Sequence, residues 1–287
     1  MASRGTPAPV LKWAGGKRQL MEEICQRLPA EIATYYEPFV GGAALFFALA
    51  AERERRFERA VLADQNSDLI NVYRALKDDA DKVIELLSAS PYAENSEKTY
   101  YAVRASKPRK LAERAARIIY LNKTGYNGLY RVNSRGEFNV PFGRYAKPNI
   151  CDAPRLLAAA EALQGVELLV ADFEDVCAHA RKNDAVYLDP PYLPVSRTAN
   201  FAAYHSERFG VEEHQRLAKV FGSLAKRGVW ALLSNSDTQD TRAIFGGFKV
   251  ETVSAARAIN SNATRRGKIS EILVSPAKSP KRNGHRK

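Results

Sequence analysis

The chain has 287 residues, of which 45% are hydrophobic, and a formal net charge of +12. This length suffices for one large α/β domain with a smaller insertion, and the longest apolar stretch, residues 40–51, is too short to cross a bilayer. Three widely spaced cysteines and four histidines without ligand spacing predict neither disulfides nor a metal site, as is typical of a protein of the reducing cytoplasm.

The positive charge is concentrated in two segments. Residues 104–147 hold eleven Lys and Arg against two acids, and residues 257–287 hold nine against one, whereas the rest of the chain has 24 basic and 29 acidic residues. Basic side chains gathered in patches favour a polyanionic partner, so we expect nucleic acid, although solubility alone would also explain a basic surface.

The first elements are typical of a nucleotide-binding α/β sheet. After a Pro/Ala/Gly-rich arm, residues 1–9, which we expect to be flexible, residues 32–37 predict a strand that leads into Gly41 and Gly42 and a helix. Strand, glycine turn and helix form the opening unit of such sheets, although the glycines are also compatible with simple strand-to-helix punctuation.

A second strand, residues 60–63, ends at an acid. Asp64 follows Gly42 by 22 residues, and Asn66 is placed to cap a helix that we expect to run to residue 77. In doubly wound sheets an acid near this spacing binds the ribose hydroxyls of a nucleoside.

The middle of the chain changes character twice. Residues 78–121 predict helices, and residues 125–145 predict a β-hairpin insertion in which Arg, Tyr and Phe alternate with Asn and Gly. Residues 153–163 predict a further helix, and residues 166–170 a strand.

The tetrapeptide Asp189-Pro190-Pro191-Tyr192 directly follows the apolar strand 185–188. Neither proline has an N–H, so the turn presents a carboxylate, a bare carbonyl and an aromatic ring together. This set suits an exocyclic amine on a flat ring: Asp189 and the Pro190 carbonyl can each accept one N–H while Tyr192 stacks. An ordinary Pro-rich turn after a strand would give the same four letters.

The C-terminal part is expected to complete the sheet. The pattern predicts a polar loop at residues 193–206, a helix at 212–225 and a strand at 229–233. It then predicts two edge strands, at 248–253 and 269–274, and a disordered basic tail at 276–287.

Three of the predicted strands end in acids, namely Glu37, Asp64 and Asp189. Ligands of open α/β sheets bind along that edge, which favours a cationic nucleoside such as S-adenosylmethionine. The glycine loop lacks the Gly-Lys-Ser/Thr ending of a triphosphate-gripping loop. We therefore predict a doubly wound, Rossmann-like α/β fold.

Taken together, the motifs resemble those of Dam-type DNA adenine N6-methyltransferases, the D12 class. The matching segments occur in family order from about residue 10 to residue 276, at residues 11–17, 37–42, 62–68, 121–145, 189–192 and 198–201. The loop departs from the pattern at Ala43, where many members of the family have a third glycine. The resemblance implies a catalytic domain at 10–77 and 150–275 and an inserted target-recognition domain at 78–149.

The resemblance also implies roles for individual residues in cofactor binding. Trp13 would lie near the methionine part of S-adenosylmethionine, Lys17 near its carboxylate and Asp64 at the ribose, while Phe173 would stack on the adenine beside Asp172. A helix cap is the alternative role for Asp172. The complete set of expected cofactor-binding residues is Trp13, Lys17, Glu37, Phe39, Gly41, Asp64, Asp172, Phe173 and Asp189.

For DNA, the resemblance implies that the hairpin reads the target sequence GATC. Tyr126 and Asn127 would enter the opened duplex, Arg131 would read a guanine edge, and Leu129 and Pro141 would contact a thymine methyl. Arg144 would hold a phosphate and Lys12 would touch the flanking guanine, whereas any one of these basic residues could also be a solvated charge.

The function expected from the sequence is therefore methylation of adenine N6 in double-stranded DNA by a monomeric, cytoplasmic and nucleoid-associated enzyme. Two alternatives stay open at this point: methyl transfer to another amine or amide, in RNA or on a protein glutamine, and a DNA-binding protein that has lost catalysis.

Overall fold

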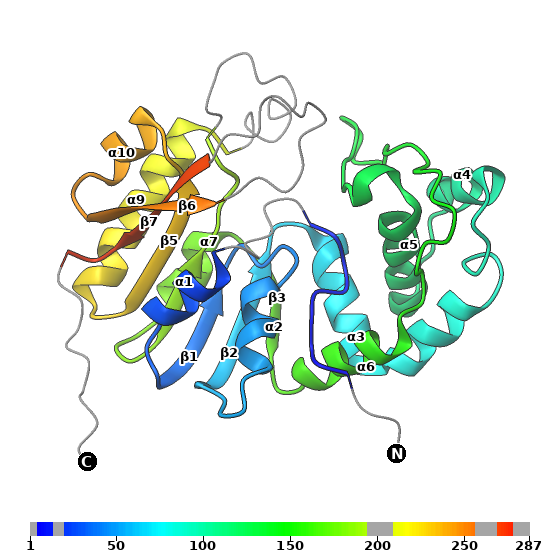
Figure 1. Ribbon diagram of the computed structural model, residues 1–287, viewed down its shortest axis with the longest axis horizontal. Coiled ribbons are helices and arrows are strands. Elements are labelled where there is room, and N and C mark those ends of the chain that lie inside the picture. The colour runs from blue at the N-terminus through cyan, green and yellow to red at the C-terminus, as the bar shows by residue number, and fades with distance from the viewer. Residues whose placement is uncertain (1–4, 14–19, 194–208, 256–268, 278–287) are drawn as a thin grey trace. The chain divides into compact units, whose positions relative to one another are not determined.

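The structure is a computed structural model that describes residues 5–13, 20–193, 209–255 and 269–277 (Figure 1). The chain divides into two compact units, each described by itself below. Unit 1 comprises residues 1–16, 40–55 and 64–170, and unit 2 comprises residues 17–39, 56–63 and 171–287.

The strands form one mixed sheet, as the sequence predicted for an α/β fold. Within the described residues it has seven strands in the order β3-β2-β1-β4-β5-β7-β6. Their bounds are β1 Ile32–Glu37, β2 Phe57–Asp64, β3 Glu167–Val170, β4 Ala185–Leu188, β5 Trp230–Ser236, β6 Lys249–Ala255 and β7 Ile269–Ser275. Strands β2, β1, β4 and β5 pair in parallel, while β7 pairs antiparallel with both β5 and β6.

The order of the last strands corrects the prediction of two edge strands. β7 lies between β5 and β6, so only β6 is at that edge of the sheet. A hydrophobic pattern gives the existence of a strand but not its neighbour, because alternation along the chain carries no information on pairing order.

Strand register brings the predicted acids to one edge of the sheet. Glu37, the last residue of β1, pairs with Leu62 of β2, two residues before Asp64. Leu188 at the end of β4 pairs with Leu233 of β5, and Asp189 follows directly. All four residues of β4 are buried, which is why this strand reads as a continuous apolar run.

The helices of unit 2 include one long amphipathic helix and three short ones. They are α1 Met21–Arg27, α7 Phe173–Ala178, α9 Val211–Lys226 and α10 Gln239–Phe245. The sequence predicted α9, whose Leu217, Phe221 and Leu224 are buried at helical spacing. It missed the other three, because six or seven residues span less than two turns and show little periodicity.

Unit 1 is mostly helical. Its helices are α2 Ala44–Ala50, α3 Ser67–Ser88, α4 Glu97–Ala105, α5 Leu111–Thr124 and α6 Ala153–Ala162, with a short 3-10 turn, η1, at Tyr126–Gly128. Asn66 caps α3 as predicted, since its side chain accepts hydrogen bonds from the N–H groups of Asp68 and Leu69. The helix continues past the expected end at residue 77, with a non-helical residue at Asp79.

Buried tyrosines tie the helices of unit 1 to its loops. The Tyr100 hydroxyl donates to the Val140 carbonyl at 2.9 Å, and the Tyr120 hydroxyl donates to the Glu94 carbonyl at 2.8 Å. Burial raises the pKa of both phenols, so each stays a neutral donor at physiological pH. The segment that follows α5 is therefore fixed to α4 by a specific polar contact.

No helix among the described residues is long and apolar enough to cross a bilayer. The same residues contain no group of three or more His, Cys, Asp or Glu side chains placed to hold a metal ion. None of the three cysteines forms a disulfide, and burial raises the pKa of Cys177 to about 12. Cys177 is thus a protonated, buried side chain at neutral pH.

Candidate active site

The Asp189-Pro190-Pro191-Tyr192 turn is held by side chains of unit 2. Asp189 and Tyr192 are half-buried, and Pro191 is exposed. The Ser234 hydroxyl at the end of β5 donates to Asp189 Oδ1 at 2.9 Å, and Ser234 Oγ lies 2.9 Å from the Tyr187 hydroxyl. The carboxylate is therefore oriented by a buried polar chain, and the sequence had not singled out Ser234.

Tyr192 is fixed at its hydroxyl end. This hydroxyl donates to Glu271 Oε2 on β7 at 2.7 Å. Burial, followed by the negative charge of Asp189, raises the pKa of Tyr192 well above its ordinary value. The ring is thus a neutral, half-buried aromatic surface next to Asp189, which is the form that stacking on a base requires.

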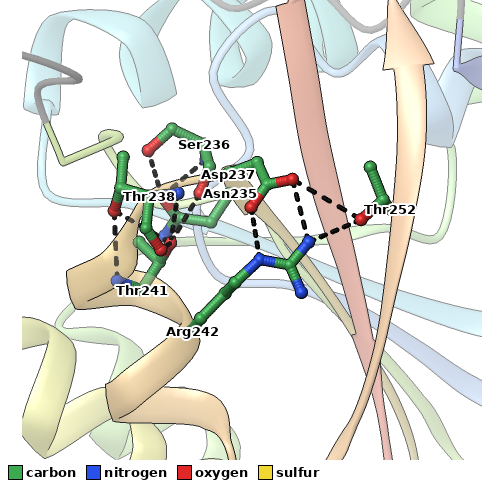
Figure 2. A network of polar contacts seen from close by, with 7 residues as sticks. All are labelled: Asn235, Ser236, Asp237, Thr238, Thr241, Arg242 and Thr252. Carbon is green, nitrogen blue, oxygen red and sulfur yellow. Dashed lines mark hydrogen bonds and ion pairs between the residues drawn. The ribbon is translucent and has the colours of Figure 1, made fainter.

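The end of β5 continues into a network of polar contacts, the β5 frame, which comprises residues 235–238, 241, 242 and 252 (Figure 2). The Ser236 hydroxyl donates to the Leu193 carbonyl at 2.8 Å, directly after Tyr192. The Thr241 hydroxyl donates to the Ser236 carbonyl at 2.7 Å, and Arg242 binds Asp237 through two hydrogen bonds of 2.6 and 2.9 Å. These contacts hold the backbone that directly follows Ser234.

In unit 1, Asp64 is bound by backbone donors. The Gly41 N–H donates to Asp64 Oδ2 at 3.2 Å and the Asn66 N–H donates to Oδ1 at 2.9 Å. Burial raises the pKa of this carboxyl, and the two N–H groups partly offset the rise. A partly desolvated carboxylate next to the glycine loop is suited to bind hydroxyl groups.

The glycine loop needs its glycines because Trp13 lies against it. Gly41 has φ +45°, and a Cβ placed on it would lie 2.8 Å from Cδ1 of Trp13. A Cβ on Gly42 would lie 3.2 Å from the Trp13 Cβ. Ala43 follows with φ 55°, in the left-handed region that favours glycine. The Trp13 side chain therefore explains why residue 41 is a glycine, whereas the role of both residues in cofactor binding stays a prediction.

The expected residues Asp172 and Phe173 begin α7 in unit 2. Asp172 caps this helix by accepting the Glu174 N–H at 2.9 Å, which is the alternative role that the sequence left open, and its place beside the cofactor adenine stays a prediction. Arg216 of α9 donates to both oxygens of Asp172 at 2.8 Å, and its guanidinium lies 4.1 Å from the centroid of the Phe173 ring. Sequence reasoning missed Arg216, since nothing in the pattern of α9 distinguishes it from a solvated charge.

Phe39 joins an aromatic cluster in unit 2. Its ring stacks on Phe173 at 5.4 Å between centroids and meets Phe209 edge-on at 5.4 Å. Glu37, two residues earlier, is buried and accepts a hydrogen bond from the Tyr35 hydroxyl at 2.9 Å. The Glu37-Pro38-Phe39 segment thus contributes one carboxylate and one aromatic ring to this unit.

The expected DNA-contacting side chains lie on the surface of unit 1. The predicted hairpin is present as two isolated antiparallel bridges, between Gly125 and Phe142 and between Val132 and Phe138, rather than as extended strands. Five of the predicted residues of this segment are exposed, namely Tyr126, Asn127, Arg131, Pro141 and Arg144. The sixth, Leu129, is half-buried. The prediction that they contact DNA stays a prediction.

Arg131 is already oriented across the hairpin. Its Nε donates to Asn139 Oδ1 at 2.7 Å and its Nη2 donates to the Asn139 carbonyl at 3.1 Å. Because this contact already restricts the Arg131 side chain to few rotamers, less conformational entropy is lost when the guanidinium binds a base. The sequence pattern did not reveal Asn139 as the partner.

Lys12 is attached to the same segment by a buried amide that the sequence reasoning missed. Asn122 accepts the Lys12 N–H at 2.8 Å, and its Nδ2 donates to the Lys12 carbonyl at 2.8 Å and to the Gly128 carbonyl at 2.9 Å. Lys12 itself is exposed, with Nζ 5.1 Å from the centroid of the Tyr145 ring. The sequence feature that could have revealed this role is a single Asn among the apolar residues at the end of α5.

Two parts of the expected site cannot be placed. Lys17, predicted to meet the cofactor carboxylate, and residues 198–201, which contribute to the resemblance, lie outside the described residues. The other expected residues fall into two sets by unit. Lys12, Trp13, Gly41, Asp64 and the hairpin belong to unit 1, whereas Glu37, Phe39, Asp172, Phe173 and residues 189–192 belong to unit 2.

Comparison with known proteins agrees with these motifs. The model of the D12 class N6 adenine-specific DNA methyltransferases matches residues 13–259. The chain is 40% identical over 274 residues to the type II methyltransferase M1.LlaDCHI of Lactococcus lactis subsp. cremoris, covering 93% of this chain and 94% of that protein. It is 40% identical to the type II methyltransferase M.MjaIII of Methanocaldococcus jannaschii, with 93% and 98% covered, and to the DNA adenine methylase of Escherichia coli K12, with 93% and 97% covered. This chain therefore belongs to the D12 class of N6 adenine-specific DNA methyltransferases and is an enzyme of that type.

Proposed function

We propose that this enzyme transfers a methyl group from S-adenosylmethionine to N6 of an adenine extruded from double-stranded DNA, within the sequence GATC. The observation that carries the proposal is the turn after β4, where Asp189 is oriented by Ser234 and is followed by the neutral ring of Tyr192. An enclosed amine in a base pair cannot reach such a turn, so the target base has to leave the duplex.

The donor set fits the proposed cofactor. S-adenosylmethionine supplies an electrophilic methyl group on a sulfonium, and its ribose carries two hydroxyls. In unit 1, the Asp64 carboxylate would accept hydrogen bonds from those hydroxyls beside Trp13. The Gly41 and Asn66 N–H groups hold this carboxylate in place. In unit 2, Glu37 and Asp189 contribute negative charge that complements a cation. The half-buried ring of Phe39 would offer aromatic surface to the adenine, and the buried ring of Phe173, which stacks on Phe39, would support it from behind. Lys17 completes the proposed set.

The residues after β4 would activate the target amine. Tyr192 stacks on the extruded adenine, and the Asp189 carboxylate and the Pro190 carbonyl each accept one proton of the N6 amine in a hydrogen bond. These bonds draw lone-pair density from the ring back onto the nitrogen. Positioning and electrostatic stabilisation near Asp189 then supply the acceleration.

The hairpin of unit 1 would provide sequence recognition. Arg131 has the fork that pairs with O6 and N7 of guanine, and Leu129 and Pro141 offer apolar surface for a thymine methyl. Tyr126 and Asn127 would enter the opened duplex. Arg144 would contact a phosphate of the DNA backbone, and Lys12 would contact the flanking guanine. The basic segment 104–147 adds non-specific attraction to phosphates.

The remaining proposals concern organisation. We propose that residues 78–149 form a target-recognition insertion in a catalytic domain made of residues 10–77 and 150–275. The enzyme would act as a monomer in the cytoplasm, where its substrate lies, in association with the nucleoid.

Methyl incorporation into defined nucleic acids tests the proposal. Labelled S-adenosylmethionine would be supplied with a duplex containing GATC, three single-base variants, the single strands and the matching RNA duplex. Nucleoside analysis of the product should give N6-methyladenine from the GATC duplex only. Equal incorporation into the variants would refute GATC specificity, and modified nucleosides from RNA alone would refute the duplex DNA substrate.

A pair of arginine variants tests the recognition role. Replacing Arg131 by Ala should cost about 1–3 kcal/mol in binding and relax the preference at one base pair. Arg135 lies at the hairpin tip with an 80% exposed side chain, and Arg135→Ala should leave the preference unchanged. If GATC and its variant lost methylation equally in Arg131→Ala, Arg131 would not read a base.

A further inference from the structure

Two side chains that hold the turn after β4 have no role in the function proposed above. Ser234 contacts Asp189 and Glu271 contacts Tyr192. We propose that Ser234 and Glu271 are positioning residues: Ser234 sets the rotation of the Asp189 carboxylate, and Glu271 sets the plane of the Tyr192 ring. The inference rests on the proposed roles of Asp189 and Tyr192 in holding the target adenine.

The direction of the hydrogen bonds at Ser234 follows from chemistry. A carboxylate can only accept, so the Ser234 hydroxyl gives its single proton to Asp189 Oδ1 at 2.9 Å. Ser234 Oγ then accepts from the Tyr187 hydroxyl, which lies at 2.9 Å. The result is a chain from Tyr187 through Ser234 to Asp189, in which every proton points toward the carboxylate.

This chain orients the carboxylate and does not lead a proton to solvent. Tyr187 and Ser234 are 1% and 0% exposed, and among the described residues the hydrogen-bond partner of the Tyr187 hydroxyl is Ser234. Burial and the charge of Asp189 keep Tyr187 in its neutral, donating form. A hydrogen bond to the half-buried Asp189 carboxylate restricts rotation about its side-chain torsion, so the carboxylate spends less time in orientations in which the target amine has no acceptor.

Strand register explains why these two residues reach the turn. Leu188 pairs with Leu233 in the parallel β4–β5 pair, which sets Ser234 beside Asp189. Ser236 pairs with Glu271 in the antiparallel β5–β7 pair, so Glu271 lies at the same end of β5. This end of β7 reaches the carboxyl edge of the parallel strands because β7 runs antiparallel between β5 and β6.

Glu271 holds the Tyr192 ring at its hydroxyl end. The Tyr192 hydroxyl donates to Glu271 Oε2 at 2.7 Å, and the backbone of the next residue is held by the Ser236 hydroxyl at the Leu193 carbonyl, 2.8 Å away. Fixing both ends of the side chain restricts its two torsions. A stacking surface held in one plane aligns the base with the acceptors of Asp189 and Pro190.

Single-turnover methylation of the GATC duplex tests the role of Ser234. A hydrogen bond to a charged group is worth about 1.5–3 kcal/mol, so Ser234→Ala should lower the transfer rate about 10- to 100-fold while the dissociation constants for S-adenosylmethionine and duplex change less than about threefold. Tyr187→Phe should have a smaller effect, and the double variant should be no slower than Ser234→Ala, because both act through one chain.

Ser90→Ala is the matched control, because it also removes a hydrogen bond from a serine to a carboxylate. The Ser90 hydroxyl donates to Glu94 Oε1 at 2.8 Å in unit 1, and neither residue has a role in the proposed chemistry. This variant should leave the transfer rate unchanged. A transfer rate of Ser234→Ala within twofold of wild type, or lowered no more than in Ser90→Ala, would overturn the role of Ser234.

Two variants of Glu271 separate acceptor from charge. Gln retains an oxygen that accepts from Tyr192, whereas Ala removes it. With 2-aminopurine at the target position of the duplex, Glu271→Ala should change the fluorescence of the bound base. With adenine at that position, Glu271→Ala should lower the transfer rate about tenfold, and Glu271→Gln should bring both readouts to within about threefold of wild type. Equal damage in the two variants, or none in either, would contradict the role of Glu271.

The same assays distinguish the inference from the function on which it rests. If the wild type methylates adenine N6 in the duplex but Ser234→Ala and Glu271→Ala match it in rate, only the positioning roles fail. If the wild type transfers no methyl group to duplex adenine, the proposed function fails and the positioning roles fail with it.

Discussion

Arg216 holds Asp172 through two hydrogen bonds of 2.8 Å and at the same time covers the ring of Phe173 at 4.1 Å. It also contacts Glu174 and Glu213, and its hydrogen bonds to Asp172 contribute most to raising its pKa. One guanidinium thus joins the start of α7 to α9. Only a planar fork can pair with both carboxylate oxygens while its face lies on an aromatic ring.

Arg216→Lys should therefore weaken cofactor binding although it keeps the charge. Because the Arg216 side chain is 34% exposed, screening limits the loss of unfolding free energy to about 1 kcal/mol. The dissociation constant for S-adenosylmethionine, measured by calorimetric titration, should rise several-fold. Arg242→Lys breaks a similar two-bond pair with Asp237 and should leave cofactor binding unchanged. Equal affinities in the two variants would show that Arg216 does not shape the proposed adenine site.

Asp64→Asn should separate stability from cofactor binding. Burial raises the pKa of Asp64 above its ordinary 3.8, so the folded wild type loses stability as the pH rises through that raised pKa. The variant carries no such charge. The free energy of unfolding of the variant minus that of wild type, measured by denaturant titration, should therefore increase from acid to neutral pH. Its affinity for S-adenosylmethionine at neutral pH should fall about tenfold or more, because a neutral amide is a weaker acceptor for hydroxyls. A stability difference that did not change with pH would contradict the assigned cause.

Gly41→Ala should destabilise the glycine loop. Its φ of +45° is unfavourable for an L side chain, and the new Cβ would lie 2.8 Å from the Trp13 ring. Left-handed strain alone is about 1–2 kcal/mol, and displacement of the indole adds to it. Urea unfolding followed by tryptophan fluorescence should show the loss. Gly247→Ala, where an added Cβ meets nothing within 4 Å, is the control and should be nearly neutral.

Asn122→Ala should weaken DNA binding without touching DNA. The variant removes three hydrogen bonds that join Lys12 and Gly128 to the end of α5, which should cost about 2 kcal/mol of stability. Because Lys12 loses its anchor, the affinity for a GATC duplex should fall several-fold at fixed salt in fluorescence anisotropy. Asn71→Ala removes another buried Asn of unit 1, which donates only to the Leu111 carbonyl at 3.3 Å among the described residues, and it should leave DNA affinity unchanged.

The elements that the sequence predicted well share one property: their signal is local. Continuous burial marks β4, amphipathic spacing marks α9, and a side-chain acceptor at Asn66 marks the start of α3. The three short helices described in unit 2 and the pairing of β7 were missed, because helices of six or seven residues and strand neighbours leave little periodic signal in the sequence. The hairpin was predicted by its turn residues, yet its backbone forms only isolated bridges.

The sequence alone determined the family, the residues at the strand ends and the glycine loop, since each of these is a contiguous motif whose chemistry is set by neighbouring residues. Only the tertiary structure decided which side chains orient that chemistry. Ser234 lies 45 residues from Asp189, Glu271 lies 79 from Tyr192, and Arg216 lies 44 from Asp172. Each pair meets because strand register and helix packing bring distant segments together, and hydrogen bonds of under 3 Å depend on that placement rather than on any local pattern.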